Sequence, residues 1–243
     1  MRDEELERYR QQLLIEGFGQ KAQKKLKQAK VLVAGIGGLG CPASIYLTAS
    51  GIGSLTLVDN GEVELSNLNR QILHWKEDVG EDKVTSAAEK LQLLNPEIEI
   101  LAMKMSIEEV NAQKLIKGKN VVVDGLDNWR TRFILNEICV KEKVPLIHAG
   151  VFALYGQITT IFPGKGPCLR CIIKKMPSEK ENLPVLGATP GVLGLLEALE
   201  VIKLITGVGK PLIGRVLSFD GEDTNIQIIN VKKDPECPVC KYI

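Results

Sequence analysis

Residues 31–59 read VLVAGIGGLGCPASIYLTASGIGSLTLVD, and this stretch decides the fold. Its first four residues, 31–34, form a short apolar run, which predicts a strand buried on both faces of a parallel sheet. Gly35, Gly37 and Gly40 follow in the spacing G-x-G-x-x-G. In this pattern the first glycine permits a tight turn, the second lets backbone approach a phosphate, and the third lets the following helix pack on the strand.

The stretch also predicts an anion site and a ribose-binding acid. The helix is expected to begin near Gly38, where its free N–H groups and positive dipole end favour a phosphate. A second apolar strand, 54–58, is followed by Asp59, whose carboxylate can accept a hydrogen bond from a ribose hydroxyl. We therefore predict a nucleotide-binding domain. The glycine pattern alone does not identify the nucleotide, and an ordinary strand–helix turn is the alternative.

The bulk composition is that of an ordinary globular protein. The 243 residues include 31 Lys and Arg against 30 Asp and Glu, so the net charge of +1 indicates neither a nucleic acid nor a membrane as partner. The charged segment 1–12 contains no apolar signal core. Residues 191–208 are apolar but include Glu197, Glu200 and Lys203, which argues against a membrane span. We expect a cytoplasmic protein.

The order of the predicted elements favours a doubly wound α/β fold. Apolar strands are expected at 31–34, 54–58, 98–105, 121–123 and 144–148. Helices are expected at 4–17, 83–94, 128–143 and 189–206, with another that starts at a capping box of Ser106 and Glu109 and ends near Gly118. Because strands and helices alternate, we predict a Rossmann-like, mostly parallel sheet with right-handed crossovers.

The pattern changes beyond residue 156. Further strands are expected at 157–162, 215–219 and 225–231, and the long helix at 189–206 lies between the first and second of them. Strands without the regular alternation with helices favour antiparallel pairing. Because no linker rich in Pro, Gly or Ser precedes this part, we predict that it continues the same sheet within one domain, 1–243.

Four of the six cysteines form two C-x-x-C pairs, Cys168 with Cys171 and Cys237 with Cys240. Two such pairs can converge as a tetrahedral all-thiolate zinc site, and without a His or carboxylate ligand the zinc is expected to be structural. A redox pair is the alternative. Zinc would hold the end of the sequence against its middle.

A second group of polar residues is expected to face phosphates. Asn67, Arg70 and Gln71 lie in SNLNRQ, Lys83 lies in GEDKV, and Asp127 ends DGLD. Asp127 follows a parallel strand, at the same rim as the glycine loop, where a carboxylate can hold Mg²⁺. Arg70 and Lys83 can neutralise a triphosphate. Taken singly, Lys83 could equally be a solvated helix charge, and Asp127 the N-cap of the next helix.

Together, the glycine loop, Asp59, SNLNRQ, Lys83, DxxDN and the paired C-x-x-C motifs resemble the MoeB/ThiF/HesA family, the bacterial and archaeal relatives of ubiquitin-activating enzymes. The resemblance covers essentially the whole chain. It implies an ATP- and Mg²⁺-dependent adenylyltransferase that activates the C-terminal glycine carboxylate of a small ubiquitin-fold sulfur carrier ending in Gly-Gly, of the MoaD or ThiS type. Pyrophosphate is released, and a sulfur donor, expected on a separate protein, then gives a thiocarboxylate. Such enzymes are usually homodimers.

The resemblance also implies roles for individual residues. Arg70, Lys83 and Asp127 would be catalytic, with Asp127 holding Mg²⁺. The nucleotide would be bound by Gly35, Gly37, Gly38, Gly40, Asp59, Asn67, Arg70, Gln71, Lys83, Asp127, Asn128, Arg8 and Arg10. The implied organisation is N-terminal helices at 1–28, a nucleotide-binding half at 29–155 and a zinc-stabilised, carrier-binding half at 156–243.

Two departures from the family pattern bear on mechanism. The N-terminal motif R-Y-x-R-Q, whose second arginine reaches the partner subunit's ATP, has Gln11 in place of that arginine, and Arg10 is displaced by one position. The loop 174–190, expected to cross the carrier's tail, lacks the cysteine of members that bind their carrier covalently. We therefore expect adenylation alone. An NAD-dependent oxidoreductase and a non-catalytic, zinc-stabilised ATP-binding scaffold remain the alternative hypotheses.

Overall fold

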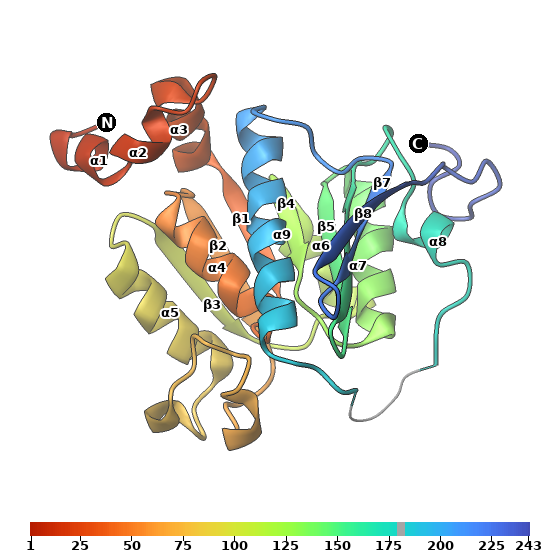
Figure 1. Ribbon diagram of the computed structural model, residues 1–243, viewed down its shortest axis with the longest axis horizontal. Coiled ribbons are helices and arrows are strands. Elements are labelled where there is room, and N and C mark those ends of the chain that lie inside the picture. The colour runs from red at the N-terminus through yellow and green to blue at the C-terminus, as the bar shows by residue number, and fades with distance from the viewer. Residues whose placement is uncertain (179–182) are drawn as a thin grey trace.

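The protein is described by a computed structural model covering residues 1–178 and 183–243. A sheet of eight strands has the order β3-β2-β1-β4-β5-β6-β7-β8 (Figure 1). The five parallel strands are β1 (Lys30–Ala34), β2 (Ser54–Asp59), β3 (Glu99–Lys104), β4 (Val121–Asp124) and β5 (Leu146–Phe152). The antiparallel continuation is formed by β6 (Tyr155–Ile161), β7 (Arg215–Asp220) and β8 (Asn225–Asn230). The predicted fold class is confirmed.

Helices cover both faces of the sheet (Figure 1). One face packs against α3 (Gly19–Gln28), α4 (Gly40–Ala49), α5 (Lys83–Leu94) and α9 (Ala188–Thr206). The other packs against α6 (Glu109–Ile116), α7 (Trp129–Glu142) and α8 (Leu169–Ile172). The remaining helices are α1 (Asp3–Arg8), α2 (Arg10–Leu13) and the 3₁₀ turns η1 (Leu65–Asn67) and η2 (Lys76–Asp78). Within the described ranges, no helix is both long and apolar enough to span a bilayer.

The strand order reverses between β1 and β4, and the predicted nucleotide-binding residues lie at this reversal. The chain moves outward from β1 to β2 and β3, then returns to β4 on the other side of β1. The helices that follow β1 and β4 therefore leave on opposite faces, and the carboxyl ends of two such strands are where open α/β sheets bind their ligands. Both strands are apolar and buried, as the runs at 31–34 and 121–123 predict.

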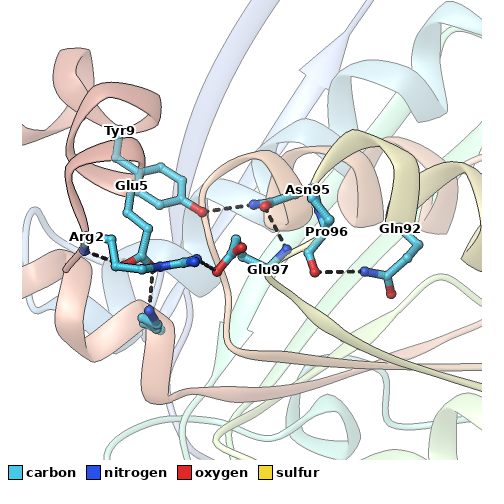
Figure 2. A network of polar contacts seen from close by, with 8 residues as sticks. Arg2, Glu5, Tyr9, Gln92, Asn95, Pro96 and Glu97 are labelled. Atoms are coloured by element: carbon cyan, nitrogen blue, oxygen red, sulfur yellow. Dashed lines mark hydrogen bonds and ion pairs between the residues drawn. The ribbon is translucent and has the colours of Figure 1, made fainter.

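The N-terminal segment is the first place where a prediction is wrong. One helix is expected over 4–17, but the structure breaks it at Tyr9, giving α1 and α2. Tyr9 is buried, and its hydroxyl accepts a hydrogen bond from Asn95 Nδ2 at 2.9 Å, just after α5 ends (Figure 2). Arg2 pairs with Glu97 in the same network. These long-range contacts, which local periodicity cannot reveal, dock the N-terminal helices against the C-terminal end of α5.

The predicted capping box of Ser106 and Glu109 is also wrong. Helix α6 begins at Glu109, with Glu108 as its N-cap, and the Asn111 side chain accepts from the Glu108 N–H at 2.9 Å. The Ser106 hydroxyl instead accepts from Asn60 Nδ2 at 3.0 Å. The expectation that the loop 174–190 crosses a carrier tail falls in part on residues 179–182, which lie outside the described ranges.

Helix α9 contains two buried acids with opposite environments. Glu200 Oε2 accepts from the Leu212 N–H at 2.7 Å and from the Thr160 hydroxyl, and Glu200 pairs with Lys203. Glu197 is fully buried, and neither of its carboxyl oxygens has a hydrogen-bond partner within the described residues. Burial, with Asp124 adding to it, raises the pKa of Glu197 well above its ordinary value. Glu197 therefore destabilises the fold wherever the unfolded chain would ionise it.

We predict that Glu197→Met stabilises the protein by about 1–3 kcal/mol at neutral pH, because it removes an unsatisfied buried polar group. The folded pKa is raised, so the folded state keeps a proton that the unfolded state releases above about pH 4.3. The free energy of unfolding of the wild type therefore decreases as pH rises from about 4.3 towards the pKa of Glu197 in the folded state. The gain in melting temperature should be larger at about pH 8 than at about pH 5.

The matched control is Glu200→Met on the same helix. It leaves the Leu212 N–H and the Thr160 hydroxyl without their acceptor, so it should lower the melting temperature. A Glu197→Met protein less stable than the wild type at about pH 8 would contradict this account of Glu197.

Candidate functional site

The loops that follow β1 and β4 touch backbone to backbone. The Gly125 N–H donates to Ala34 O at 2.8 Å, and a Cβ placed on Gly35 would lie 2.6 Å from Gly125 O. Gly35 also has φ +87°, a left-handed conformation that favours glycine. A Cβ on Gly40 would lie only 1.9 Å from Gly35 O. The first and third glycines of the motif are thus required by close packing, and α4 begins at Gly40 rather than near Gly38.

Two side chains support the glycine loop from beneath. Asp59 Oδ2 accepts from the Ile36 N–H and Oδ1 from the Gly61 N–H, both at 2.7 Å. The buried His74 ring donates from Nε2 to Ile36 O at 3.1 Å, and burial lowers the pKa of this histidine. Asp59 therefore has a backbone role that the sequence did not predict. A carboxylate has further lone pairs, so ribose binding by Asp59 stays a prediction.

The SNLNRQ segment lies along the glycine loop. Asn67 is buried, and its Oδ1 accepts from the Glu64 N–H at 3.1 Å. Arg70 Nη1 donates to Ser66 O at 2.8 Å and to Asn69 Oδ1 at 2.9 Å. These contacts hold the segment in shape, and they occupy only part of the five N–H donors of the Arg70 guanidinium.

Gln71 turns its amide towards the glycine loop. Its Nε2 lies 3.9 Å from where a Cβ on Gly37 would stand, whereas its Oε1 is buried without a hydrogen-bond partner among the described residues. Buried polar atoms are normally paired with protein groups or ordered water, so this acceptor calls for a hydrogen-bond donor. Beside a glycine that leaves room for backbone approach, this acceptor fits a polar ligand such as a nucleotide.

The N-terminus of α9 closes the other side of the glycine loop. A Cβ on Gly38 would lie 3.1 Å from the Pro190 ring and 3.6 Å from Arg70 Cγ. A Cβ on Gly187 would lie 2.1 Å from Asn69 O. Gly38, Arg70 and Pro190 therefore meet at one place, although they come from three separate segments of the sequence.

Lys83 and Asp127 approach the same rim from opposite sides. Lys83 is the first residue of α5, and its Nζ lies 3.4 Å from where a Cβ on Gly61 would stand, next to Asp59 Oδ1 at 3.1 Å from that point. Asp127 is exposed in the loop that follows β4. The N-cap of α7 is Asn128, whose Oδ1 accepts from the Thr131 N–H at 2.9 Å. Asp127 is therefore not the helix cap, which leaves its carboxylate for another role.

A buried charged group behind this loop was missed by sequence analysis. Asp124 lies 2.7 Å from His148 Nδ1 and 3.6 Å from Arg132 Nε, and all three side chains are buried. Burial lowers the pKa of His148, so a neutral imidazole donates to the carboxylate. Asp124 ends β4 and His148 lies within β5. Only the tertiary structure brings them to Arg132 on α7.

Arg8 and Arg10 do not reach this site within one chain. Arg8 Nη1 donates to Leu94 O at 3.1 Å, at the C-terminal end of α5, and Arg10 pairs with Glu7 at 3.6 Å. Lys83 lies at the opposite end of α5, which is about 17 Å away along a helix of this length.

The four predicted zinc ligands come together in the structure. Buried Sγ atoms of Cys168, Cys171, Cys237 and Cys240 all lie within 4.8 Å of one another. Individual Sγ–Sγ distances are 3.9, 3.6 and 3.4 Å, close to the value of about 3.8 Å that tetrahedral zinc–thiolate geometry gives. The donor set and spacing fit zinc, and the convergence predicted from the two C-x-x-C pairs is confirmed.

The chain is similar to several known proteins. Residues 9–239 match the model of the ThiF family. The chain is 38% identical to the SAMP-activating enzyme E1 of Haloferax volcanii over 242 residues, covering 97% of this chain and 89% of that protein. It is 39% identical to the adenylyltransferase and sulfurtransferase MOCS3-1 of Zea mays, covering 96% of this chain and about half (51%) of that protein.

Solved structures of E. coli MccB are also similar to this protein. The crystal structure of E. coli MccB with MccA-N7isoASN matches with a TM-score of 0.89 and 28% identity, covering 97% of this chain and 74% of that one. MccB has also been crystallised with ATP, and that structure matches with a TM-score of 0.83 and 30% identity over 90% of this chain and 69% of the other. This protein therefore belongs to the ThiF family, alongside E1-type activating enzymes and adenylyltransferases.

Proposed function

We propose that this protein uses ATP and Mg²⁺ to adenylate the C-terminal glycine carboxylate of a ubiquitin-fold sulfur carrier, releasing pyrophosphate ahead of thiocarboxylate formation by a donor on a separate protein. The observation that carries the proposal is the packing of Arg70 and Gln71 against the glycine loop, with Lys83 next to Asp59 at the end of β2 and Asp127 exposed in the loop after β4. Family membership, the activating enzyme of H. volcanii and the ATP complex of MccB support it.

The reaction requires positioning and charge neutralisation. A carboxylate oxygen of the carrier attacks the α-phosphorus of ATP, a new C–O–P link forms, and the bond from the α-phosphorus to the bridging oxygen breaks as pyrophosphate leaves. The attacking carboxylate is already ionised at pH 7, so the step needs no general base. Arg70 and Lys83 supply positive charge where negative charge accumulates. Neither His74 nor His148 is assigned a proton-transfer role.

Mg²⁺ fits the oxygen donor at Asp127. Magnesium prefers carboxylate oxygens, phosphate oxygens and water, and usually takes only one or two carboxylates from a protein. Asp127 is exposed at the end of β4 and is not required as a helix cap. When bound, Mg²⁺ would neutralise phosphate oxygens of the nucleotide.

The cysteines support adenylation without a covalent carrier intermediate on this chain. All six are buried, and four belong to the cluster assigned to zinc. Burial raises the pKa of Cys41 to about 12 and raises that of Cys139 as well. Neither thiol has the accessible, low-pKa character of a nucleophilic cysteine.

A homodimer would place the N-terminal arginines of one chain near the nucleotide of another. Arg8 and Arg10 lie far from the site in their own chain, at the other end of α5. Large apolar side chains are exposed on neighbouring helices, including Tyr46 on α4 and Val192, Leu195 and Leu199 on α9. Such a patch is suited to an interface with a second copy.

The direct test of the function is ATP–pyrophosphate exchange with Mg²⁺, with and without a candidate carrier ending in Gly-Gly. We expect exchange that depends on the carrier. Asp127→Ala should reduce the rate by about 100-fold or more while the melting temperature stays unchanged, because an electrostatic contact is lost from the transition state. Asp223→Ala, at the exposed turn between β7 and β8, is the matched control and should retain wild-type exchange.

The outcomes separate the hypotheses. Undiminished exchange by Asp127→Ala would refute the assignment of Asp127. Binding of ATP by the wild-type protein, with no exchange in the presence of any carrier, would instead favour the non-catalytic scaffold.

For the cysteine cluster, we predict that Cys168→Ser lowers both the zinc content and the melting temperature, because one missing thiolate opens the tetrahedral site. Elemental analysis and thermal unfolding measure the two effects. Cys139→Ala changes another buried cysteine in the same core and should keep its zinc. Equal zinc content in Cys168→Ser and the wild type would show that this cluster does not hold the metal.

The dimer proposal predicts complementation between two inactive variants. One carries Arg8→Ala with Arg10→Ala, and the other carries Asp127→Ala. After unfolding and refolding together in equal amounts, roughly one quarter of the sites would combine intact residues from both chains, assuming random pairing in a two-fold dimer. Exchange activity should recover to about that fraction of wild type. No recovery in a mixture shown to contain mixed dimers would exclude a site shared between chains.

A further inference from the structure

Leu126, the residue before Asp127, has both of its polar backbone groups held by buried charged side chains. Its N–H donates to Asp124 Oδ1 at 3.2 Å, and its carbonyl oxygen accepts from Arg132 Nη2. We call this arrangement of Asp124 and Arg132 around Leu126 the Leu126 clamp. With both backbone groups held, the peptide plane that leads into Asp127 has a fixed orientation.

The clamp is attached to the strands behind it. Arg132 Nη2 also donates to Ala149 O on β5 at 3.1 Å, and the second carboxylate oxygen of Asp124 accepts from His148 Nδ1 at 2.7 Å. Asp124 ends β4, and the Trp129 ring lies 5.0 Å from the Arg132 guanidinium carbon. The two charged residues thus tie the loop that carries Asp127 to two adjacent strands of the sheet and to α7.

A contribution to folding stability does not by itself explain why the charged side chains of Asp124 and Arg132 are buried together. Removing a charged pair from water costs free energy that its mutual attraction often fails to repay, and apolar replacements of similar volume are frequently as stable. The location of the clamp is informative instead, because among the described residues both hydrogen bonds from Arg132 end on backbone carbonyls, one in the loop and one in β5. Residues that orient a metal ligand from behind commonly affect metal affinity without touching the metal.

We infer that Arg132, acting with Asp124, is a positioning residue that fixes the Asp127 carboxylate for a divalent cation bound with the nucleotide. This rests on the proposed role of Asp127. It adds to that role a residue that touches neither ATP nor metal and acts only through the Leu126 backbone.

The test measures ATP affinity by calorimetry, once with saturating Mg²⁺ and once with EDTA. In the wild type, Mg²⁺ should strengthen ATP binding, and Asp127→Asn should remove most of that gain. Arg132→Met should reduce the gain by about 10–100-fold, as expected for a residue behind a metal ligand, and should leave the metal-free affinity within about threefold of wild type. Arg132→Lys keeps the charge but has no planar fork to serve two carbonyls, so it should give an intermediate gain.

The matched control is Arg215→Met. Arg215, at the start of β7, also donates to two backbone carbonyls, Pro211 O at 2.8 Å and Lys210 O at 3.2 Å, but belongs to a different loop. It should keep the full effect of Mg²⁺. Thermal unfolding identifies any variant that fails to fold, and Arg132→Lys then replaces Arg132→Met in the comparison.

The possible failures are distinguishable. If Asp127→Asn keeps the wild-type gain from Mg²⁺, the proposed role of Asp127 is wrong. If Asp127→Asn loses the gain but a folded Arg132 variant keeps it, the positioning role is overturned while the proposed function stands. If the Arg132 variant binds ATP poorly even in EDTA, Arg132 acts on the nucleotide site itself, and the inference is also overturned.

Discussion

The close contact between the loops after β1 and β4 is the constraint on which the other features of the site depend. A parallel sheet presents its ligand crevice where two neighbouring strands send their helices to opposite faces, and here those strands are hydrogen-bonded neighbours. The first turn of each loop must therefore fit against the other, and only glycine backbone at Gly35 and Gly125 allows it. Once that contact is made, the glycine loop and the loop that carries Asp127 lie at the same edge of the sheet.

The residues that hold this edge of the sheet in place show how much of the candidate site could be predicted from the sequence. The glycine spacing, the acid at the end of β2 and the paired C-x-x-C motifs are local patterns with a fixed physical meaning. The glycine spacing correctly predicted a strand–turn–helix, and the paired motifs correctly predicted that the four cysteines converge. The backbone role of Asp59, the neutral His74 beneath Ile36 and the clamp around Leu126 depend on contacts between residues far apart in the chain. No periodicity or spacing encodes those contacts. The break at Tyr9 was missed for the same reason, since its partner Asn95 lies 86 positions away.

Helix α9 shows that burial alone does not define the role of a charge. Glu200 and Glu197 lie three positions apart on α9, and both are buried. Glu200 satisfies backbone and hydroxyl donors of neighbouring strands, and so helps to attach α9 to the sheet. Glu197 has no such donor among the described residues and faces the potential of Asp124 and Arg132. Its cost is offset by apolar residues of the same helix, such as Leu193, Ala198 and Val201, which are buried in the core.

A metal at the cysteine cluster would restrict the conformations of the unfolded chain. A metal held there would close a ring of 65 intervening residues between Cys171 and Cys237, and this ring contains α9, β7 and β8. A cross-link over such a length removes about 4 kcal/mol of configurational freedom from the unfolded chain, by the relation used for disulfides. Because the N-terminus of α9 packs on Gly38 and Arg70, the ring also includes a segment in contact with the glycine loop, where nucleotide binding is proposed. Metal content and nucleotide affinity would then be thermodynamically linked, even though the two sites share no ligand.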